Sequence, residues 1–179
     1  MKSTKFLIQE HKVILRALDV LDAMSTSVEG SGKIDEADAD KILDFLRWFG
    51  DAHHQAKEEI ILFPALKSAA SAQDRPIQHM IHEHGQDRAL IEEMEAAVRV
   101  KKLSEFVSCA NKLSSTVRNH IYKEDDILFE LAAQVIDAAS DETVLDRLNR
   151  FETPLDKDIL SARLQELRSL EWKYLRRQS

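Results

Sequence analysis

The sequence predicts an all-α protein, an up-and-down four-helix bundle with additional C-terminal helices. The 179 residues include only 4 glycines and 3 prolines, so turn signals are scarce and the elements should be long. Apolar residues recur at intervals of three and four, which is the helical period. Leu, Ala, Glu, Lys and Asp are abundant, and β-branched residues do not form the alternating runs of strands. These observations together favour a few long helices.

Apolar spacing and capping residues place four long helices in the first part of the chain. The first is expected over residues 3–24, followed by a polar loop of serine and glycine. The second begins near Asp35, a good N-cap residue, and Pro64 should kink or end it. The third covers about 74–100 and the fourth about 103–136. Four helices of this length are sufficient for an up-and-down bundle.

Two shorter helices are expected after the bundle. Ser140 is predicted to cap the first, and Thr153–Pro154 to open the second, since proline suits the first helical position. We therefore divide the chain into a four-helix bundle, residues 1–138, and a C-terminal helical appendage, residues 139–179. The appendage is expected either to pack on the bundle or to form a homodimer contact.

Charge and composition exclude several classes of function. The net charge of -7 argues against nucleic-acid binding, which needs a basic surface. No apolar run is long enough to span a bilayer, and residues 1–11 do not resemble a secretory signal. The single cysteine, Cys109, excludes an internal disulfide. We expect a cytoplasmic protein with no nucleic-acid or membrane partner.

An internal repeat carries the chemistry of this sequence. Residues 54–63 read HQAKEEIILF and residues 120–129 read HIYKEDDILF, with identical residues at six positions. In each stretch a histidine is followed by a glutamate four residues later. The preceding helices are also alike, because each carries a Glu-His pair, at residues 10–11 and 83–84. The pattern indicates a helical hairpin used twice.

The repeat predicts a buried site for metal ions. Residues i and i+4 share a helix face, so His54 with Glu58, and His120 with Glu124, can reach one ion together. Both pairs and the histidines of the two preceding helices lie on apolar faces. A single inward histidine is more often a hydrogen-bonded core residue. Two buried glutamates, however, need positive charge that neutral imidazoles cannot supply, so the doubled pattern favours a dinuclear metal site.

The pattern resembles the hemerythrin-like (HHE cation-binding) family, notably in HHQAKEEIILFPAL and NHIYKEDDILF, over about residues 5–135. The resemblance implies a non-haem di-iron centre with an oxo or hydroxo bridge and with both glutamates shared between the ions. The histidines of the first hairpin would serve one ion and those of the second the other. Imidazole and carboxylate also suit manganese or zinc. The implied metal ligands are His11, His54, Glu58, His84, His120 and Glu124.

One departure from oxygen-carrying hemerythrins bears on function. Those proteins have a His-xxx-His pair on the third helix, whereas Met80 stands one turn before His84 here. Glu124 follows its histidine at i+4, where oxygen carriers have Asp at i+5. Fewer protein ligands leave more coordination positions open, which favours reaction at the metal over reversible oxygen storage.

Residues around the ligands are expected to orient them or to line a ligand pocket. Glu59, Asp125 and Asp126 are predicted to be solvated, and Lys57 to lie off the ligand face. Gly50, one turn before His54, is expected either to make room for a small ligand or to mark close helix packing. The residues predicted to orient an imidazole or a bound oxygen species are Glu10, Asp51, His53, Glu83, Asp87 and Tyr122.

Three functions fit these features. The first is a di-iron protein that binds or reacts with oxygen, peroxide or nitric oxide, as a sensor, a scavenger or a peroxide-consuming enzyme; all three need the same centre. The second is iron delivery for the repair of iron–sulfur centres, disfavoured because such proteins usually carry an additional N-terminal cysteine-containing domain. The third is a metal-free helical interaction module. Metal content separates the third from the others.

Overall fold

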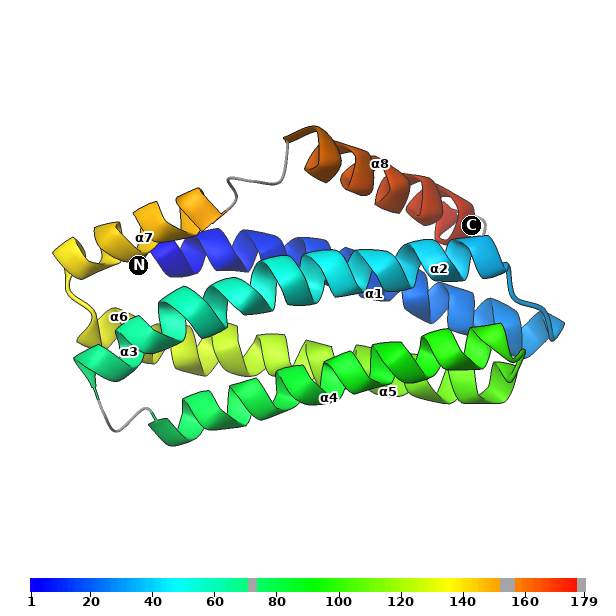
Figure 1. Ribbon diagram of the computed structural model, residues 1–179, viewed down its shortest axis with the longest axis horizontal. Helices are drawn as coiled ribbons and strands as arrows, with labels where there is room; N and C mark the ends of the chain where they lie inside the picture. The colour runs from blue at the N-terminus through cyan, green and yellow to red at the C-terminus, as the bar shows by residue number, and fades with distance from the viewer. Residues whose placement is uncertain (71–73, 152–156, 177–179) are drawn as a thin grey trace.

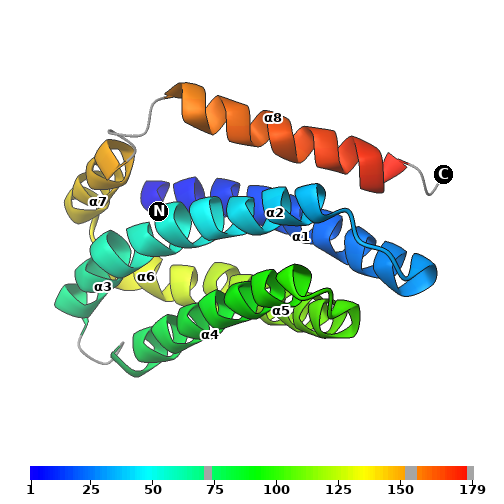
Figure 2. The same ribbon diagram turned by 45° about the vertical axis from the view of Figure 1, so that its right-hand side comes forward.

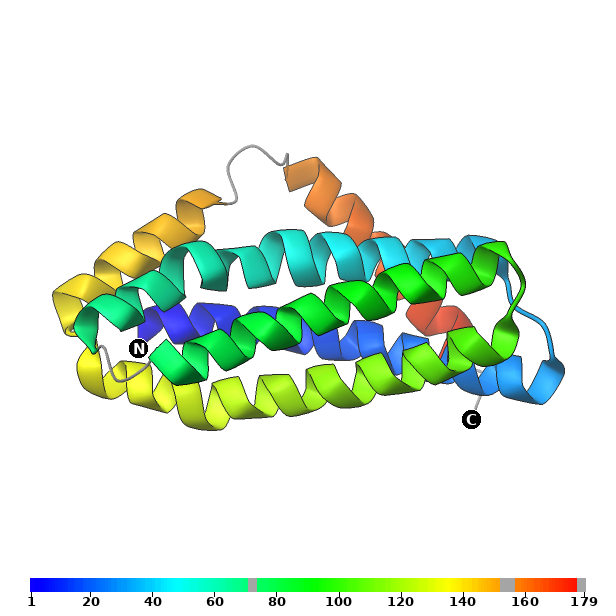
Figure 3. The ribbon, with the colours of Figure 1, turned by 60° about the horizontal axis from the view of Figure 1, so that its bottom comes forward.

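Four long helical rods form the body of the molecule. The computed structural model describes residues 1–70, 74–151 and 157–176, and this part of the chain is helical, without strands. The first rod is α1 (Lys2–Ser31), and the third is α4 (Asp74–Arg99). The rods lie side by side in alternating directions (Figures 1 and 3). The prediction of an all-α helical bundle is confirmed.

The second and fourth rods contain π-helical turns. The second runs through α2 (Glu36–Phe45), two π segments (Leu46–Gln55 and Glu58–Leu62) and α3 (Phe63–Ala69). The fourth runs through α5 (Leu103–Lys123), a π segment (Glu124–Leu128) and α6 (Phe129–Val135). Both rods continue along the bundle (Figure 1). The segments Glu58–Leu62 and Glu124–Leu128 begin where the repeat places its Glu-Glu and Glu-Asp residues, whereas Leu46–Gln55 lies before them.

Two expectations about the ends of these rods are wrong. Of the two effects expected of Pro64, the ending of the second rod is wrong, because Pro64 lies in the first turn of α3, where the missing N–H is tolerated. A kink at Pro64 stays a prediction. The first helix does not end at residue 24 but continues to Ser31, and Gly32 closes it in the left-handed conformation. Its last turns are held by buried Ser25 and Val28, and the Ser25 hydroxyl donates to Asn111 Oδ1 at 3.0 Å. Tertiary packing outweighs the polar composition there.

Helix α7 (Ala138–Phe151) lies against the first turn of α1. Asp141 accepts hydrogen bonds from the Lys2 and Ser3 backbone N–H groups at 2.7 and 3.1 Å, so α7 caps α1. Ser140 is not the N-cap of α7, because the helix begins earlier and Asp137 Oδ1 accepts from the Ser140 N–H. Asp141, although distant in the sequence, therefore satisfies backbone N–H groups in the first turn of α1.

Helix α8 (Lys157–Tyr174) crosses α1 and α2 on the outside of the bundle (Figure 2). Its Leu167 and Leu170 are buried, and Arg16 of α1 pairs with Glu171 through two hydrogen bonds of 2.7 and 2.8 Å. Thr153 and Pro154 lie outside the described residues. The division of the chain near residue 138 and a dimer contact through the appendage stay predictions.

The core consists of two hydrophobic clusters with a polar layer between them. The larger cluster includes Leu18, Leu43, Met94, Leu113 and Leu167; the smaller includes Leu7, Leu62, Ile77, Leu128 and Leu148. On each rod the candidate ligands fall between residues of the two clusters. No helix in the described ranges combines the length and hydrophobicity of a membrane span.

Candidate metal centre

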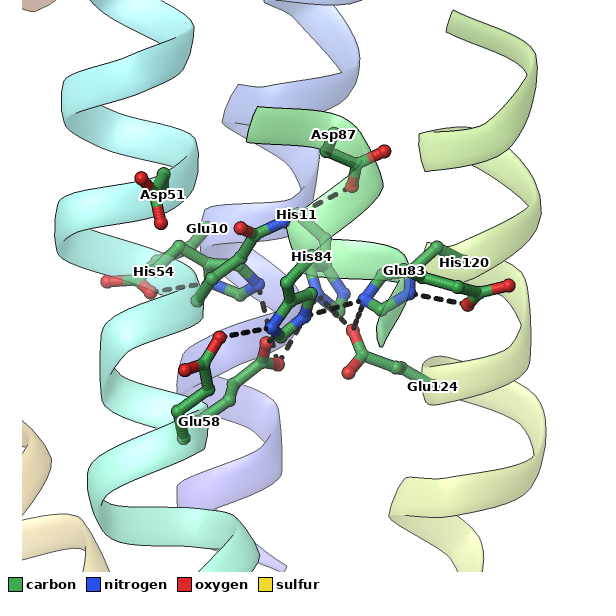
Figure 4. A network of polar contacts seen from close by, with 12 residues as sticks. Glu10, His11, Asp51, His54, Glu58, Glu83, His84, Asp87, His120 and Glu124 are labelled. Atoms are coloured by element: carbon green, nitrogen blue, oxygen red, sulfur yellow. Dashed lines mark hydrogen bonds and ion pairs between the residues drawn. The ribbon is translucent and has the colours of Figure 1, made fainter. Parts of the chain in front are cut away.

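The polar layer brings together the six residues that the repeat singled out. His11 comes from α1, His84 from α4 and His120 from α5, whereas His54 and Glu58 come from the second rod. These residues and Glu124 are each at most 4% exposed. Their side chains converge from all four rods (Figure 4). The structure thus collects four imidazoles and two carboxylates in one dry layer.

The two glutamates begin matching π turns. The Phe63 N–H bonds to the Glu58 carbonyl, and the Phe129 N–H bonds to the Glu124 carbonyl, so the i+5 pattern recurs in both hairpins. A π turn changes the direction of the side chains that follow it, and such turns are common at functional sites. The duplicated sequence therefore also duplicates a local backbone irregularity at the site.

The donor atoms at the centre form two overlapping groups. The Nε2 atoms of His11 and His120 each lie 3.3 Å from Glu124 Oε2. The Nε2 atoms of His54 and His84 lie 3.5 and 3.6 Å from the oxygens of Glu58. Both glutamates belong to each group, and within a group the donors lie within 4.8 Å of one another. One group is His11, His54, Glu58 and Glu124, and the other is Glu58, His84, His120 and Glu124.

A carboxylate binds the outer nitrogen, Nδ1, of each of the four imidazoles. Asp125 binds His11 at 2.7 Å, and Glu59 binds His84 at 2.8 Å. Each comes directly after a central glutamate. Glu10 and Glu83 bind His54 and His120, both at 2.9 Å, and each comes directly before a histidine of the site. An ionised carboxylate only accepts, so Nδ1 carries a proton and Nε2 is the nitrogen that faces the centre. The Nε2 atoms of His84 and His120 lie 3.1 Å apart, so one of them donates to the other.

Basic side chains hold most of these outer carboxylates. Lys57 donates to Glu10 at 2.5 Å, and Lys123, its counterpart in the repeat, donates to Glu83. Arg88 donates to Glu59 at 2.7 Å and also to Asp51. Lys57 is 0% exposed, whereas the Lys123 side chain is 21% exposed. The two halves of the network share a plan but differ in burial.

Several expectations about this network need correction. Glu59 and Asp125 are not merely solvated, since each binds an imidazole, although Asp126 is exposed as expected. The sequence offered one indication of this role, because both residues are acidic and occupy the same position of the repeat. Lys57 is not part of either donor group, in line with its expected place off the ligand face, but it is buried against Glu10, His53 and the Phe6 ring.

Only some of the residues expected to orient an imidazole bind one directly. Glu10 and Glu83 bind imidazoles as predicted. Tyr122 is 60% exposed, so the prediction that it supports the centre is wrong. Asp51 pairs with Arg88, and Asp87 accepts from Gln55. His53 Nε2 lies 2.9 Å from Lys57 Nζ and 3.2 Å from Glu10 Oε1, so it contacts the network directly.

Unsatisfied polar atoms show that the layer fits a cation. Both oxygens of Glu58, both of Glu124 and Nε2 of His11 are buried, and none finds a hydrogen-bond partner among the described residues. Buried polar atoms without partners are rare, because each retains the cost of leaving water. A metal cation between the two groups would satisfy these carboxylate and imidazole donors together.

Burial and neighbouring charges shift the pKa values of the groups at the centre. Burial and the adjacent Glu124 carboxylate raise the pKa of Glu58 well above its ordinary value. Burial opposes ionisation of Glu124 too, but His120 and His11 hold its pKa well below normal. Burial disfavours charge on these two imidazoles, yet their carboxylate partners raise both pKa values to about 9. Burial and the nearby His11 charge lower the pKa of His54 to about 4.

A small cavity opens beside the centre. Its volume is about 30 Å³. Apolar side chains line it together with Gly50, Asp51, His54, Gln55, Asp87, Arg88 and His120. A buried water needs roughly 10–15 Å³ of such space, so the cavity admits about two waters or one molecule of similar size. A Cβ atom on Gly50 would meet nothing within 4 Å. Close helix packing therefore does not require this glycine, which borders open space instead.

The fold and the layer define a class of protein: a helical bundle whose interior can hold metal cations between shared carboxylates. The model of the hemerythrin HHE cation-binding domain matches residues 2–132, so the chain belongs to this family. None of the curated proteins matches the chain. The molecule thus has a hemerythrin-like domain, and its histidine–glutamate groups are compatible with metal binding.

Proposed function

We propose that this protein is a non-haem di-iron protein that binds or reacts with a small oxidant: oxygen, peroxide or nitric oxide. His11 and His54 would hold one ion, His84 and His120 the other, and Glu58 and Glu124 would contact both. Iron in that position would supply a redox-active site with room for an external ligand. A sensor, a scavenger and a peroxide-consuming enzyme are the forms that this function can take.

The observation that carries the proposal is the pair of buried glutamates with four unpartnered oxygens, faced by four imidazole Nε2 atoms. A metal-free module would gain nothing from this arrangement, because buried carboxylates without partners destabilise a fold. The outer carboxylates also fix the imidazoles in the tautomer that metal binding needs. The cavity beside His54 and His120 then supports a small external ligand over a large substrate.

Metal analysis with optical spectroscopy tests the proposal. Protein produced with iron supplementation should contain about two iron ions per chain, and its visible spectrum should change on addition of oxygen, peroxide or nitric oxide. Iron content without a response to any of them would contradict the oxidant function. Restoration of an inactivated iron–sulfur enzyme by the loaded protein would then favour iron delivery. If the purified protein contains no metal, and added metal leaves its melting temperature unchanged, the result would favour an interaction module.

Replacement of one shared carboxylate tests the ligand assignment. Glu58→Ala should lower metal content to one ion per chain or fewer, because Glu58 belongs to both donor groups. Glu130→Ala is the matched control, since Glu130 is exposed on α6 and should leave metal content unchanged. Inductively coupled plasma mass spectrometry on both variants gives the answer. Equal metal content in the two variants would remove Glu58 from the centre.

A further inference from the structure

Gln55 carries a buried hydrogen-bond acceptor that the centre does not use. The side chain follows His54 on the second rod and is 8% exposed. Its amide nitrogen donates to Asp87 Oδ2 at 3.3 Å, but its Oε1 atom has no hydrogen-bond partner among the described residues. A buried carbonyl oxygen without a donor is costly to keep. Its presence at this place points to a donor supplied from outside the chain.

Asp87 fixes which way the Gln55 amide faces. An ionised carboxylate only accepts hydrogen bonds, so the amide NH₂ must face it and Oε1 must face away. The Asp87 carboxylate is itself buried, and Thr116 Oγ1 lies 3.4 Å from its other oxygen. The orientation of the unpartnered acceptor is therefore imposed by the fold.

Gln55 and Asp87 both line the cavity of about 30 Å³ that His54 and His120 border. A ligand in this cavity lies beside the candidate metal layer. The rest of the lining is apolar, apart from Gly50 and the ion pair of Asp51 with Arg88. Oxygen and nitric oxide carry no hydrogen to donate. A molecule with an O–H group of the same size, such as hydrogen peroxide, can donate to Gln55 Oε1 and still fit.

We propose that Gln55 makes this site selective for a small hydroperoxide over diatomic gases, by accepting a hydrogen bond from the O–H group of the ligand. Asp87 acts as a positioning residue, because it holds the amide with its oxygen free. This inference rests on the proposed function and narrows its ligand to the peroxide class. It requires no chemical step by Gln55, only recognition.

Iron-loaded protein provides the first test. The variants are Gln55→Leu and, as a matched control, Gln86→Leu, which removes an exposed amide on α4. Spectral changes are followed by stopped flow with hydrogen peroxide and, separately and without oxygen, with nitric oxide. Gln55→Leu should slow the response to peroxide by about tenfold or more, the loss expected for one hydrogen bond, and leave that to nitric oxide unchanged. Gln86→Leu should alter neither.

Two results would overturn the inference. One is an unchanged peroxide response in Gln55→Leu; the other is an equal loss for both ligands, which would indicate a disturbed site rather than lost recognition. Gln55→Met, which keeps the unbranched shape, replaces Leu if metal content falls. Asp87→Asn should weaken the selectivity for peroxide over nitric oxide. The introduced asparagine side chain can donate as well as accept, so the Gln55 amide is no longer held with its oxygen facing the cavity. A wild-type protein that responds to nitric oxide but not to peroxide keeps the proposed function and refutes this selectivity.

Crystals of the metal-free protein give a readout that needs no reaction. Soaked with hydrogen peroxide, wild-type crystals should show electron density for a two-oxygen molecule within hydrogen-bond distance of Gln55 Oε1, which unsoaked wild-type crystals and soaked Gln55→Leu crystals lack. Ordered water alone at Oε1 after the soak would refute the role of Gln55. An Oε1 atom satisfied by protein atoms, or facing an empty cavity after the soak, would refute the role of Gln55. This result stands even if the iron-loaded protein responds to no oxidant, so the two proposals fail separately.

Discussion

A neighbouring carboxylate fixes the protonation of one nitrogen, Nδ1, in each imidazole of the centre. The carboxylates of Glu10, Glu59, Glu83 and Asp125 take the Nδ1–H, and the same contact sets the plane of each ring. Such outer contacts keep ligands ready for a metal and raise their basicity. The metal affinity should therefore depend on residues that touch no metal.

The contact of Asp125 with His11 gives a direct test of this dependence. Asp125→Asn keeps the shape but loses the charge that favours the Nδ1–H tautomer, so metal affinity should fall by about 10- to 100-fold. Asp126→Asn is the control, since the neighbouring side chain is exposed. Competition with a coloured chelator measures both. Equal affinities would show that the Asp125 contact does not tune the site.

Burial makes Lys57 more important to the fold than its counterpart Lys123. Lys57→Met leaves the buried Glu10 carboxylate without its ammonium partner, and should lower the free energy of unfolding by about 3 kcal/mol. Lys123→Met should cost less than half as much, because water reaches Lys123 and Glu83. Urea denaturation of the metal-free variants measures both values. A larger loss of unfolding free energy in Lys123→Met than in Lys57→Met would contradict the deeper burial of the Lys57–Glu10 pair.

At the level of helices, the four-rod arrangement and the central residues could be predicted from spacing alone. The i, i+4 pairs and the duplicated hairpin leave His54 and Glu58 little choice of face. The π turns could not be predicted, because no propensity distinguishes them from α-helix in this sequence. The burial of Lys57 was also not predicted. A lysine is buried only when it pairs with an acidic group of another element, here Glu10, and that pairing depends on the tertiary structure.

The second rod should tolerate a side chain at Gly50 but lose space beside the centre. Gly50→Ala should stabilise the helix by about 0.5–1 kcal/mol, since a Cβ meets nothing within 4 Å, and should also slow ligand entry to the cavity. Gly85→Ala is the matched control, because Gly85 is also helical with free space but does not line the cavity. Thermal melts and stopped-flow spectra separate the two effects. Unchanged ligand entry in Gly50→Ala would place the route elsewhere.

Across the whole molecule, a layer of charge divides the hydrophobic core into two clusters. In the metal-free protein this layer holds extra protons, because the pKa values of His11 and His120 rise to about 9 and that of Glu58 rises well above normal. The folded state therefore binds more protons than the unfolded state between about pH 6.5 and 9. Metal must displace these protons to bind.

This proton balance predicts opposite pH trends for the two forms. The contribution of the charged imidazoles is complete below their unfolded pKa and lost as pH rises through about 9, so the metal-free protein should become less stable above pH 6.5. The increase in melting temperature caused by metal should grow over the same range. Calorimetry with and without metal measures both. A metal effect that shrinks as pH rises would contradict the protonation states inferred for the layer.

The contrast between Lys57, sealed inside, and Lys123, which water reaches, has a consequence for a centre with two occupants. Two copies of one hairpin would give identical compartments if the surroundings were identical. Unequal shielding breaks that equivalence, so a pair of ions held here would fill in sequence and carry separate spectral signatures. The repeated motif would then provide two distinct chemical positions with the same kinds of donor atoms.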